Sequence, residues 1–328
     1  MRRTLAVLAV LLPPLAQAAD LKVIDSIKGA DGGWDLVSVD TEANRLFVAR
    51  TDGVMAVDLA TGAVTPTLVP GKKVHHIVAV PGGVAASTNG DTSDVTLFKA
   101  ADGTVLGSVP VGKKPDAITY DPKNKLVVAM NAKDGTVSLI DTDKKAAVGT
   151  ISVGGALELA VADGEGKVFV NVEDKYEVVA LDIAGRKVLA HYPLTGCDGP
   201  TGLAIDTADH VLLSACDNGK AVATSAVDGH VVATLPIGAH PDTVIYDEKN
   251  KRFLVPCGGD GVLTVISAEG GHLASAGTVT TAKGARTGAI DPATGKIYLP
   301  TAEFQPAKAG ERPAAVPGTF HLLVVGQN

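Results

Sequence analysis

Short apolar runs recur along this chain, and each run ends at residues typical of tight turns. Residues 115–154 contain four such runs in succession, PDAITYDPKNKLVVAMNAKDGTVSLIDTDKKAAVGTISVG. Runs of this length that are rich in Val, Ile and Leu and bounded by Gly, Pro, Asn and Asp are typical of β-strands. The stretch therefore predicts four strands joined by turns.

The four-run pattern returns along the chain at a nearly constant interval. Its starts lie 40 to 44 residues apart, at Trp34, Val74, Pro115, Ala156, Pro200, Pro241 and Ala285. Four short strands and their turns occupy ~40–45 residues in a propeller blade, and one blade cannot bury its own apolar faces. The pattern predicts an all-β fold, a seven-bladed β-propeller of four-stranded blades.

The first predicted strand of several repeats ends in aspartate, as at Asp40, Asp121, Asp206 and Asp247. Turn formers follow, such as Pro-Lys-Asn after Asp121. We expect these carboxylates to cap nearby backbone N–H groups rather than to carry chemistry.

The two ends of the chain predict how the ring closes. The seventh repeat supplies only three strands, the last at 319–325, and an apolar run at 21–27 precedes the first repeat. Placing 21–27 outside 319–325 completes the last blade and covers an exposed strand edge. We therefore expect residues 19–328 to form one domain.

Residues 302–317, which contain three prolines, predict a long loop that is either a functional lid or mobile.

The repeat at 115–154 resembles that of the YVTN family of β-propellers, the periplasmic YncE-like proteins. The matching features are the Asp121-Pro122 turn, residues 126–131 in the YVTN position, and the run GTVSLID at 135–141. The resemblance extends over all seven repeats and is strongest in the third and sixth. It implies a seven-bladed propeller in the bacterial envelope. It leaves the function open, because related propellers serve as ligand binders, DNA binders, lactonases and redox-enzyme domains.

The first eighteen residues have the features of a signal peptide. Two arginines precede a short apolar run at 5–12, and Ala16-Gln17-Ala18 supplies a cleavage site before Ala19. The apolar run is too short to span a bilayer, so the mature chain is expected to have no transmembrane segment. Residues 1–18 are therefore expected to be removed, and a periplasmic or secreted location is expected.

Charge and composition narrow the classes of partner. The chain has 29 Lys and Arg against 36 Asp and Glu, a formal net charge of −7, and only 4% aromatic residues. Nucleic-acid surfaces need clustered Lys and Arg to displace counterions. Nucleic-acid binding is thus disfavoured, although the family resemblance keeps a DNA-binding envelope propeller as a second alternative. A small ligand or an envelope protein is the expected partner.

One aligned position at the start of the first strand is polar in six of the seven repeats: Asp35, His75, Asp116, Thr201, Asp242 and Arg286, with Leu157 in the fourth. If the repeats are in register, these side chains and their neighbours meet at one mouth of the central channel: Asp35, His75, Asp116, Glu158, His240, Asp242 and Arg286. Such a group could bind a divalent cation or a cationic ligand, or act as general acid and base. The competing interpretation is that they are solvated or hydrogen-bond a neighbouring blade. Whether a metal is bound stays open.

The three cysteines permit one disulfide in an exported protein. Cys197 and Cys216 are expected on the same face of the fifth blade, and we favour this pair. Cys216 with Cys257 is the rival pair, and three buried thiols are the third alternative. No C-x-x-C-H haem motif and no phosphate-binding glycine loop before a helix occurs, so neither haem nor a nucleotide is expected.

The sequence thus favours an exported, non-catalytic β-propeller that binds a ligand or protein partner at the polar mouth of its channel. No catalytic residue is predicted. The main alternative is a metal-dependent hydrolase of the lactonase kind that uses the carboxylates of the mouth.

Overall fold

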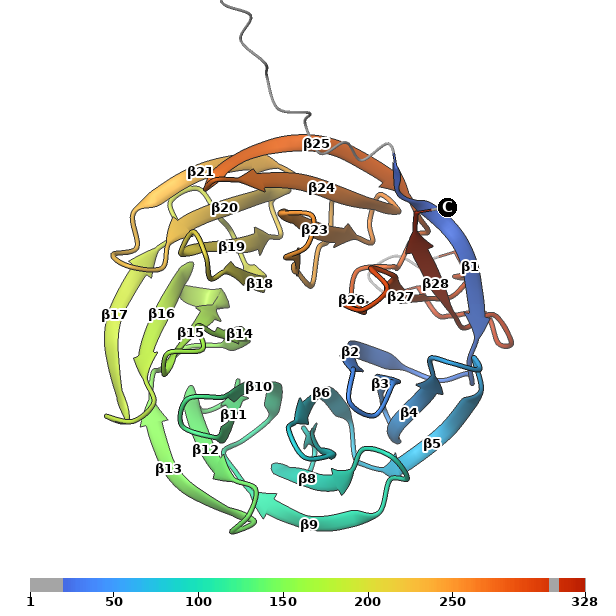
Figure 1. Cartoon of the computed structure of the whole chain (residues 1–328), viewed down its shortest axis with the longest axis horizontal. Helices are drawn as coiled ribbons and strands as arrows, with labels where there is room; N and C mark the ends of the chain where they lie inside the picture. Colours follow the sequence, from blue (N-terminus) through green and yellow to red (C-terminus); the bar gives the residue numbers. More distant parts are fainter. Residues whose placement is uncertain (1–19, 307–312, 328) are drawn as a thin grey trace, which may run out of the picture.

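The computed structural model describes residues 20–306 and 313–327 and arranges them as a ring of seven four-stranded antiparallel sheets (Figure 1). The predicted seven-bladed β-propeller is confirmed. The predicted signal peptide lies outside the described residues, as do residues 307–312 of the proline-containing loop.

The blades are numbered along the chain, and the strands of each run from the channel outward. Blade 1 consists of β2 (Trp34–Asp40), β3 (Arg45–Arg50), β4 (Gly53–Asp58) and β5 (Val64–Pro70), and blade 2 of β6 (Val74–Val80), β7 (Val84–Asn89), β8 (Asp94–Lys99) and β9 (Val105–Pro110). Blade 3 consists of β10 (Pro115–Asp121), β11 (Leu126–Asn131), β12 (Thr136–Asp141) and β13 (Ala146–Ser152). Blade 4 consists of β14 (Leu157–Ala162), β15 (Lys167–Val172), β16 (Glu177–Asp182) and β17 (Lys187–Pro193). A single 3₁₀ turn, η2 (Glu173–Lys175), joins β15 to β16.

The remaining three blades follow the same order. Blade 5 consists of β18 (Pro200–Asp206), β19 (Val211–Cys216), β20 (Lys220–Ser225) and β21 (Val231–Pro236). Blade 6 consists of β22 (Ile245–Asp247), β23 (Arg252–Cys257), β24 (Val262–Glu269) and β25 (His272–Thr280). Blade 7 consists of β26 (Ala289–Ile290), β27 (Ile297–Thr301), β28 (His321–Gly326) and β1 (Lys22–Lys28).

The N-terminal strand closes the ring. β1 pairs antiparallel with β28, with Lys22 opposite Gly326 and Lys28 opposite His321. Figure 1 shows β1 as the outermost strand of the last blade, beside β28. The expected closure is confirmed, and it covers the edge that β28 would otherwise expose.

The apolar core lies between blades rather than within them. Seven clusters of buried side chains each join two neighbouring blades. Phe47 of blade 1 meets Phe98 of blade 2 edge to face, with ring centroids 5.8 Å apart. The closing interface joins Val37 and Leu46 of blade 1 to Leu322 of blade 7. Each blade therefore depends on its neighbours for burial.

The aspartates at the ends of the first strands cap turns, as expected. The Asp40 carboxylate accepts hydrogen bonds from the N–H groups of Glu42 and Ala43 at 3.0 and 2.9 Å. Asp121 accepts one from the N–H of Lys123 at 3.0 Å. Because these turns lie at the opposite end of the strands from the predicted mouth, they contribute nothing to a site there.

Candidate binding site at the channel mouth

Irregular strand pairing presents the aligned residues to the channel. In blades 1 to 5 the register of the first strand shifts within its first four residues, where the pairing slips between Trp34 and Val37, for example. A β-bulge re-aims side chains that regular pairing would alternate between the two faces of a sheet. Asp35, His75, Asp116 and Glu158 all lie in these bulges.

The residue before each aligned start adopts a left-handed conformation in blades 2 to 7. Glycine holds this position in blades 4, 5 and 7, whereas Lys73, Lys114 and His240 hold it in the others, with φ of 55°, 53° and 53°. Residues other than glycine adopt such angles at a cost of ~1–3 kcal/mol, and they cluster at functional sites. All three side chains line the mouth.

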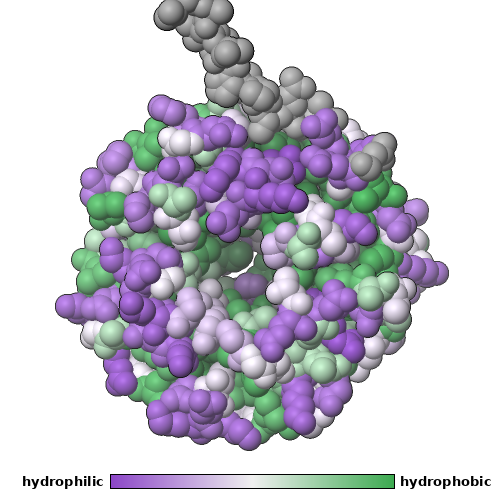
Figure 2. Space-filling view, viewed as in Figure 1, coloured by the Kyte–Doolittle hydropathy of each residue, from purple (hydrophilic) through white to green (hydrophobic). Residues whose placement is uncertain are grey.

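A cavity of about 720 Å³ occupies the mouth, and the opening at the centre of the ring is visible in Figure 2. Its lining includes the seven predicted residues: Asp35, His75, Asp116, Glu158, His240, Asp242 and Arg286. Two other residues of the aligned position are structural: Leu157 is fully buried, and the Thr201 hydroxyl donates to the Pro241 carbonyl at 3.2 Å.

Four further charged residues line the cavity and are not among those predicted from the sequence: Lys73, Lys114, Glu173 and Asp217. A signal for the lysines exists, because Gly-Lys-Lys precedes the first strand at both 71–73 and 112–114. Six carboxylates face three Lys or Arg side chains in this lining, a formal excess of three negative charges with both histidines neutral. The cavity therefore attracts cations.

His75 lies between two carboxylates. Its Nδ1 is 2.6 Å from Asp35 Oδ2 and 3.0 Å from Asp116 Oδ1, and the residue is 7% exposed. Lys114 Nζ bonds the other oxygen of Asp116 at 2.9 Å. Although burial opposes it, this hydrogen bond and the charge of Asp116 raise the pKa of Lys114. Lys114 therefore stays charged.

The neighbouring His76 does not join this cluster. Its Nδ1 accepts a hydrogen bond from the Ile118 N–H at 3.3 Å, across the interface with blade 3. Burial lowers the pKa of His76 to about 4, against the opposing charge of Asp116. His76 is thus a neutral packing residue at the interface with blade 3.

Glu158 is a half-buried carboxylate of the mouth and, like Glu173 and Asp217, is not held by a neighbouring side chain in the part of the chain that the structure describes. Among the described residues it has no hydrogen-bond or ion-pair partner, since Lys114 is engaged by Asp116. Burial, reinforced by the charges of Asp116, Asp242 and Glu173, raises the pKa of Glu158 to about 9. An added cation would offset these effects.

Asp242 and Arg286 form an ion pair across blades 6 and 7. Arg286 Nε lies 3.2 Å from Asp242 Oδ2, and the Asp242 N–H donates to the Arg286 carbonyl at 3.2 Å. Burial raises the pKa of Asp242 to about 7, against the opposing charge of Arg286. Four of the six acidic groups of the lining, Glu158, Glu173, Asp217 and Asp242, are thus balanced weakly or, among the described residues, not at all.

Asp35, His75 and Asp116 also have the composition of a metal site, because one ligand atom from each lies within 4.8 Å of the others. Carboxylate and imidazole groups suit Zn²⁺ or Mn²⁺. Within the described part of the chain, however, His75 Nε2 is buried without a partner. A metal on Nδ1 would require a proton on Nε2, and a buried N–H without an acceptor is rare. The arrangement therefore fits an Nδ1–H donor to the carboxylates better than a metal ligand.

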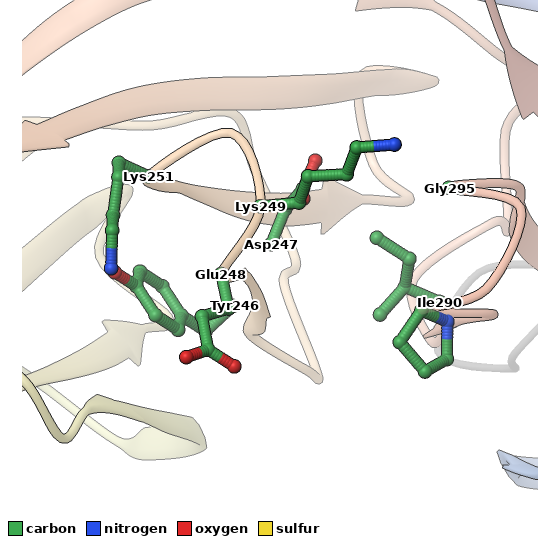
Figure 3. A pocket seen from close by; sticks show the side chains of 8 residues that line it. Tyr246, Asp247, Glu248, Lys249, Lys251, Ile290 and Gly295 are labelled. Atoms are coloured by element: carbon green, nitrogen blue, oxygen red, sulfur yellow. The ribbon is translucent and has the colours of Figure 1, made fainter.

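A second cavity, of about 450 Å³, lies between blades 6 and 7 at the opposite end of the strands (Figure 3). It is formed by the turns β22–β23 and β26–β27, and Tyr246 and Ile290 contribute its apolar walls. Glu248 and Lys249 are exposed at its edge. Its buried carboxylate, Asp247, is already engaged by Arg252 Nε at 2.9 Å, so this cavity is a weaker site than the mouth.

A disulfide joins Cys197 to Cys216, with Cα atoms 5.4 Å apart, and Cys257 is a buried free thiol. The bond ties the loop that enters blade 5 to the end of β19. Disulfides persist in oxidising compartments. No described helix is long and apolar enough to cross a bilayer.

Comparison with known proteins supports the fold alone. No family model and no curated protein matches the chain. A chain of the mitotic checkpoint complex superposes with a TM-score of 0.76 at 13% identity, covering 99% of this chain and 97% of its own. A chain of hydrazine synthase from Kuenenia stuttgartiensis gives 0.69 at 15% identity, covering 83% and 94%. At such identities the shared feature is the propeller architecture.

Proposed function

We propose that this protein is an exported, non-catalytic binding protein of the YncE-like kind that holds a positively charged ligand at the mouth of its channel. Export rests on the signal-like residues 1–18 and on the disulfide. The observation that carries the proposal is Glu158, a half-buried carboxylate that has no hydrogen-bond or ion-pair partner among the described residues and lies near three other acidic groups. Such a group is costly unless something compensates its charge.

The experiment compares Glu158→Gln with Glu165→Gln. Glu165 belongs to the same blade, but its side chain is 80% exposed and it lies on the turn at the opposite end of the strands. A panel of primary amines and quaternary ammonium compounds is screened by thermal shift. We expect at least one cation to stabilise the wild type and Glu165→Gln but not Glu158→Gln. If no cation stabilises the wild type, or all three proteins respond alike, the proposal is wrong.

A metal-dependent hydrolase is the second candidate, because Asp35, His75 and Asp116 bring carboxylate and imidazole ligand atoms within 4.8 Å of one another, although the unpartnered His75 Nε2 argues against it. Calorimetry with Zn²⁺, Mn²⁺ and Ca²⁺ tests it directly. Binding that disappears in Asp116→Asn, together with a lactonase activity lost on chelation, would support this candidate over the first. An absence of heat with all three metals would eliminate it.

A further inference from the structure

An apolar cavity adjoins the acidic mouth. It has a volume of about 830 Å³, within the range of small-molecule sites. Trp34, Phe304, Val316 and Phe320 supply its apolar walls. The two cavities share Trp34 together with His240 and Arg286. One ligand could therefore reach both.

The aromatic walls of this cavity pack against one another and against Arg50. The Trp34 ring lies 5.0 Å from that of Phe320 and 6.2 Å from that of Phe304, centroid to centroid. The Arg50 guanidinium stacks on Phe320 at 4.2 Å, and its Nη2 donates to the carbonyls of Ala30 and Gly32 at 2.7 and 3.1 Å. The turn at residues 30–32 and the rings of Trp34 and Phe320 are thus held in position before a ligand binds.

The described ends of the proline-containing loop form the other wall. The N–H of Val316 donates to the carbonyl of Glu303 at 2.8 Å, and Phe304 pairs with Ala315 in an isolated bridge. Phe304 packs so closely on Gly284 that a Cβ there would clash with its ring. The contacts around Phe304 and Val316 therefore orient the ring toward Trp34.

The acidic mouth and the adjoining apolar cavity together form one continuous site, called the joined site below. Its charges differ along its length. The mouth carries the excess of carboxylates, with Glu158 unpaired. The apolar cavity has Lys283 and Arg286 at its edge, both exposed, and Arg286 is neutralised by Asp242. The carboxylate of Asp31 is engaged by the Gly318 N–H at 2.6 Å. A positive group is accordingly stabilised in the mouth and an uncharged group beside Trp34.

We propose, building on the proposed function, that the joined site binds a small organic cation carrying an apolar group the size of an aromatic ring. Its ammonium group lies in the mouth beside Glu158, and its apolar body lies against Trp34 and Phe304. A bare metal ion would make no use of the apolar walls, and an organic anion would be repelled by the carboxylates of the mouth.

Three probes separate the contributions: 4-phenylbutylamine, butylamine, and 4-phenylbutyrate. Calorimetry gives their affinities, and fluorescence reports occupancy, because Trp34 is the only tryptophan of the chain and lines both cavities. The variants are Phe304→Ala and Val316→Ser, with Tyr176→Ala as the control. Tyr176 is 48% exposed and lines neither cavity.

We expect 4-phenylbutylamine to bind at least about tenfold more tightly than butylamine and to change the Trp34 emission. Phe304→Ala and Val316→Ser should reduce this advantage, whereas Tyr176→Ala should not. Equal binding of both amines, weakened only by Glu158→Gln, would overturn the inference and leave the proposed function standing. Tighter binding of 4-phenylbutyrate than of either amine would overturn both proposals. No binding of either amine would overturn the inference, and the panel of amines and quaternary ammonium compounds would then decide the proposed function.

Discussion

Replacing Glu158 by Gln should stabilise the protein, and the gain should grow with pH. The pKa of Glu158 is raised from 4.5 to about 9 in the folded state. Between these values the folded state holds a proton that the unfolded state has lost, so the wild type loses stability as pH rises. Glutamine does not titrate, and the variant should lack this loss.

The pKa shift sets the size of the effect. Each pKa unit corresponds to about 1.4 kcal/mol, which gives a ceiling of about 3 kcal/mol at pH 7 and about 6 kcal/mol above pH 9. Solvent reaching the mouth lowers this ceiling, because effective protein dielectric constants are near ~20. We expect the difference in unfolding free energy between variant and wild type to widen by about 1–3 kcal/mol from pH 5 to pH 9.

Urea denaturation at pH 5, 7 and 9 measures this difference. The control Glu165→Gln removes the same charge from an exposed position and should follow the wild type. A Glu158→Gln curve that runs parallel to the wild type at all three pH values would refute the reasoning, as would a variant that loses stability on raising the pH.

Three further results are expected. Binding of 4-phenylbutylamine should tighten from pH 7 toward pH 9 by up to about tenfold per pH unit, because the ammonium group favours ionised Glu158 and stays protonated itself. Calorimetry that shows tighter binding at lower pH would contradict this. Cys197→Ser should cost about 3 kcal/mol in urea denaturation, and reductant should destabilise the wild type and Cys257→Ala but not Cys197→Ser; a wild type insensitive to reductant would be the contrary result. Deleting residues 22–28 should expose β28, lower the thermal midpoint by roughly 10 °C or more and promote association in light scattering; an unchanged midpoint would argue against closure by β1.

The fold was largely predictable because each repeat has its own pattern of apolar runs and turn residues, which indicates its strands. The first strands begin at Trp34, Val74, Pro115 and Pro200, as the alignment predicts. In blades 6 and 7 they begin later, at Ile245 and Ala289, because the entering segments bend away from regular pairing: Pro241 keeps only an isolated bridge to Cys257. Local sequence does not encode such departures.

The site was predictable only in part. Register alone indicates that Asp35, Asp116 and Glu158 meet, since repeats place equivalent positions around one axis. The isolation of Glu158 depends on which carboxylate Lys114 engages, a matter of side-chain geometry. The aromatic cavity depends on closure, which brings Phe304 to Trp34 from the far end of the chain.

The most direct test of the cation-binding claim is a crystal structure of the protein with 4-phenylbutylamine. The account predicts the ammonium nitrogen within hydrogen-bond distance of the Glu158 carboxylate and the phenyl ring against Trp34. A ligand found between blades 6 and 7 beside Tyr246, or an amine directed away from the mouth, would contradict it.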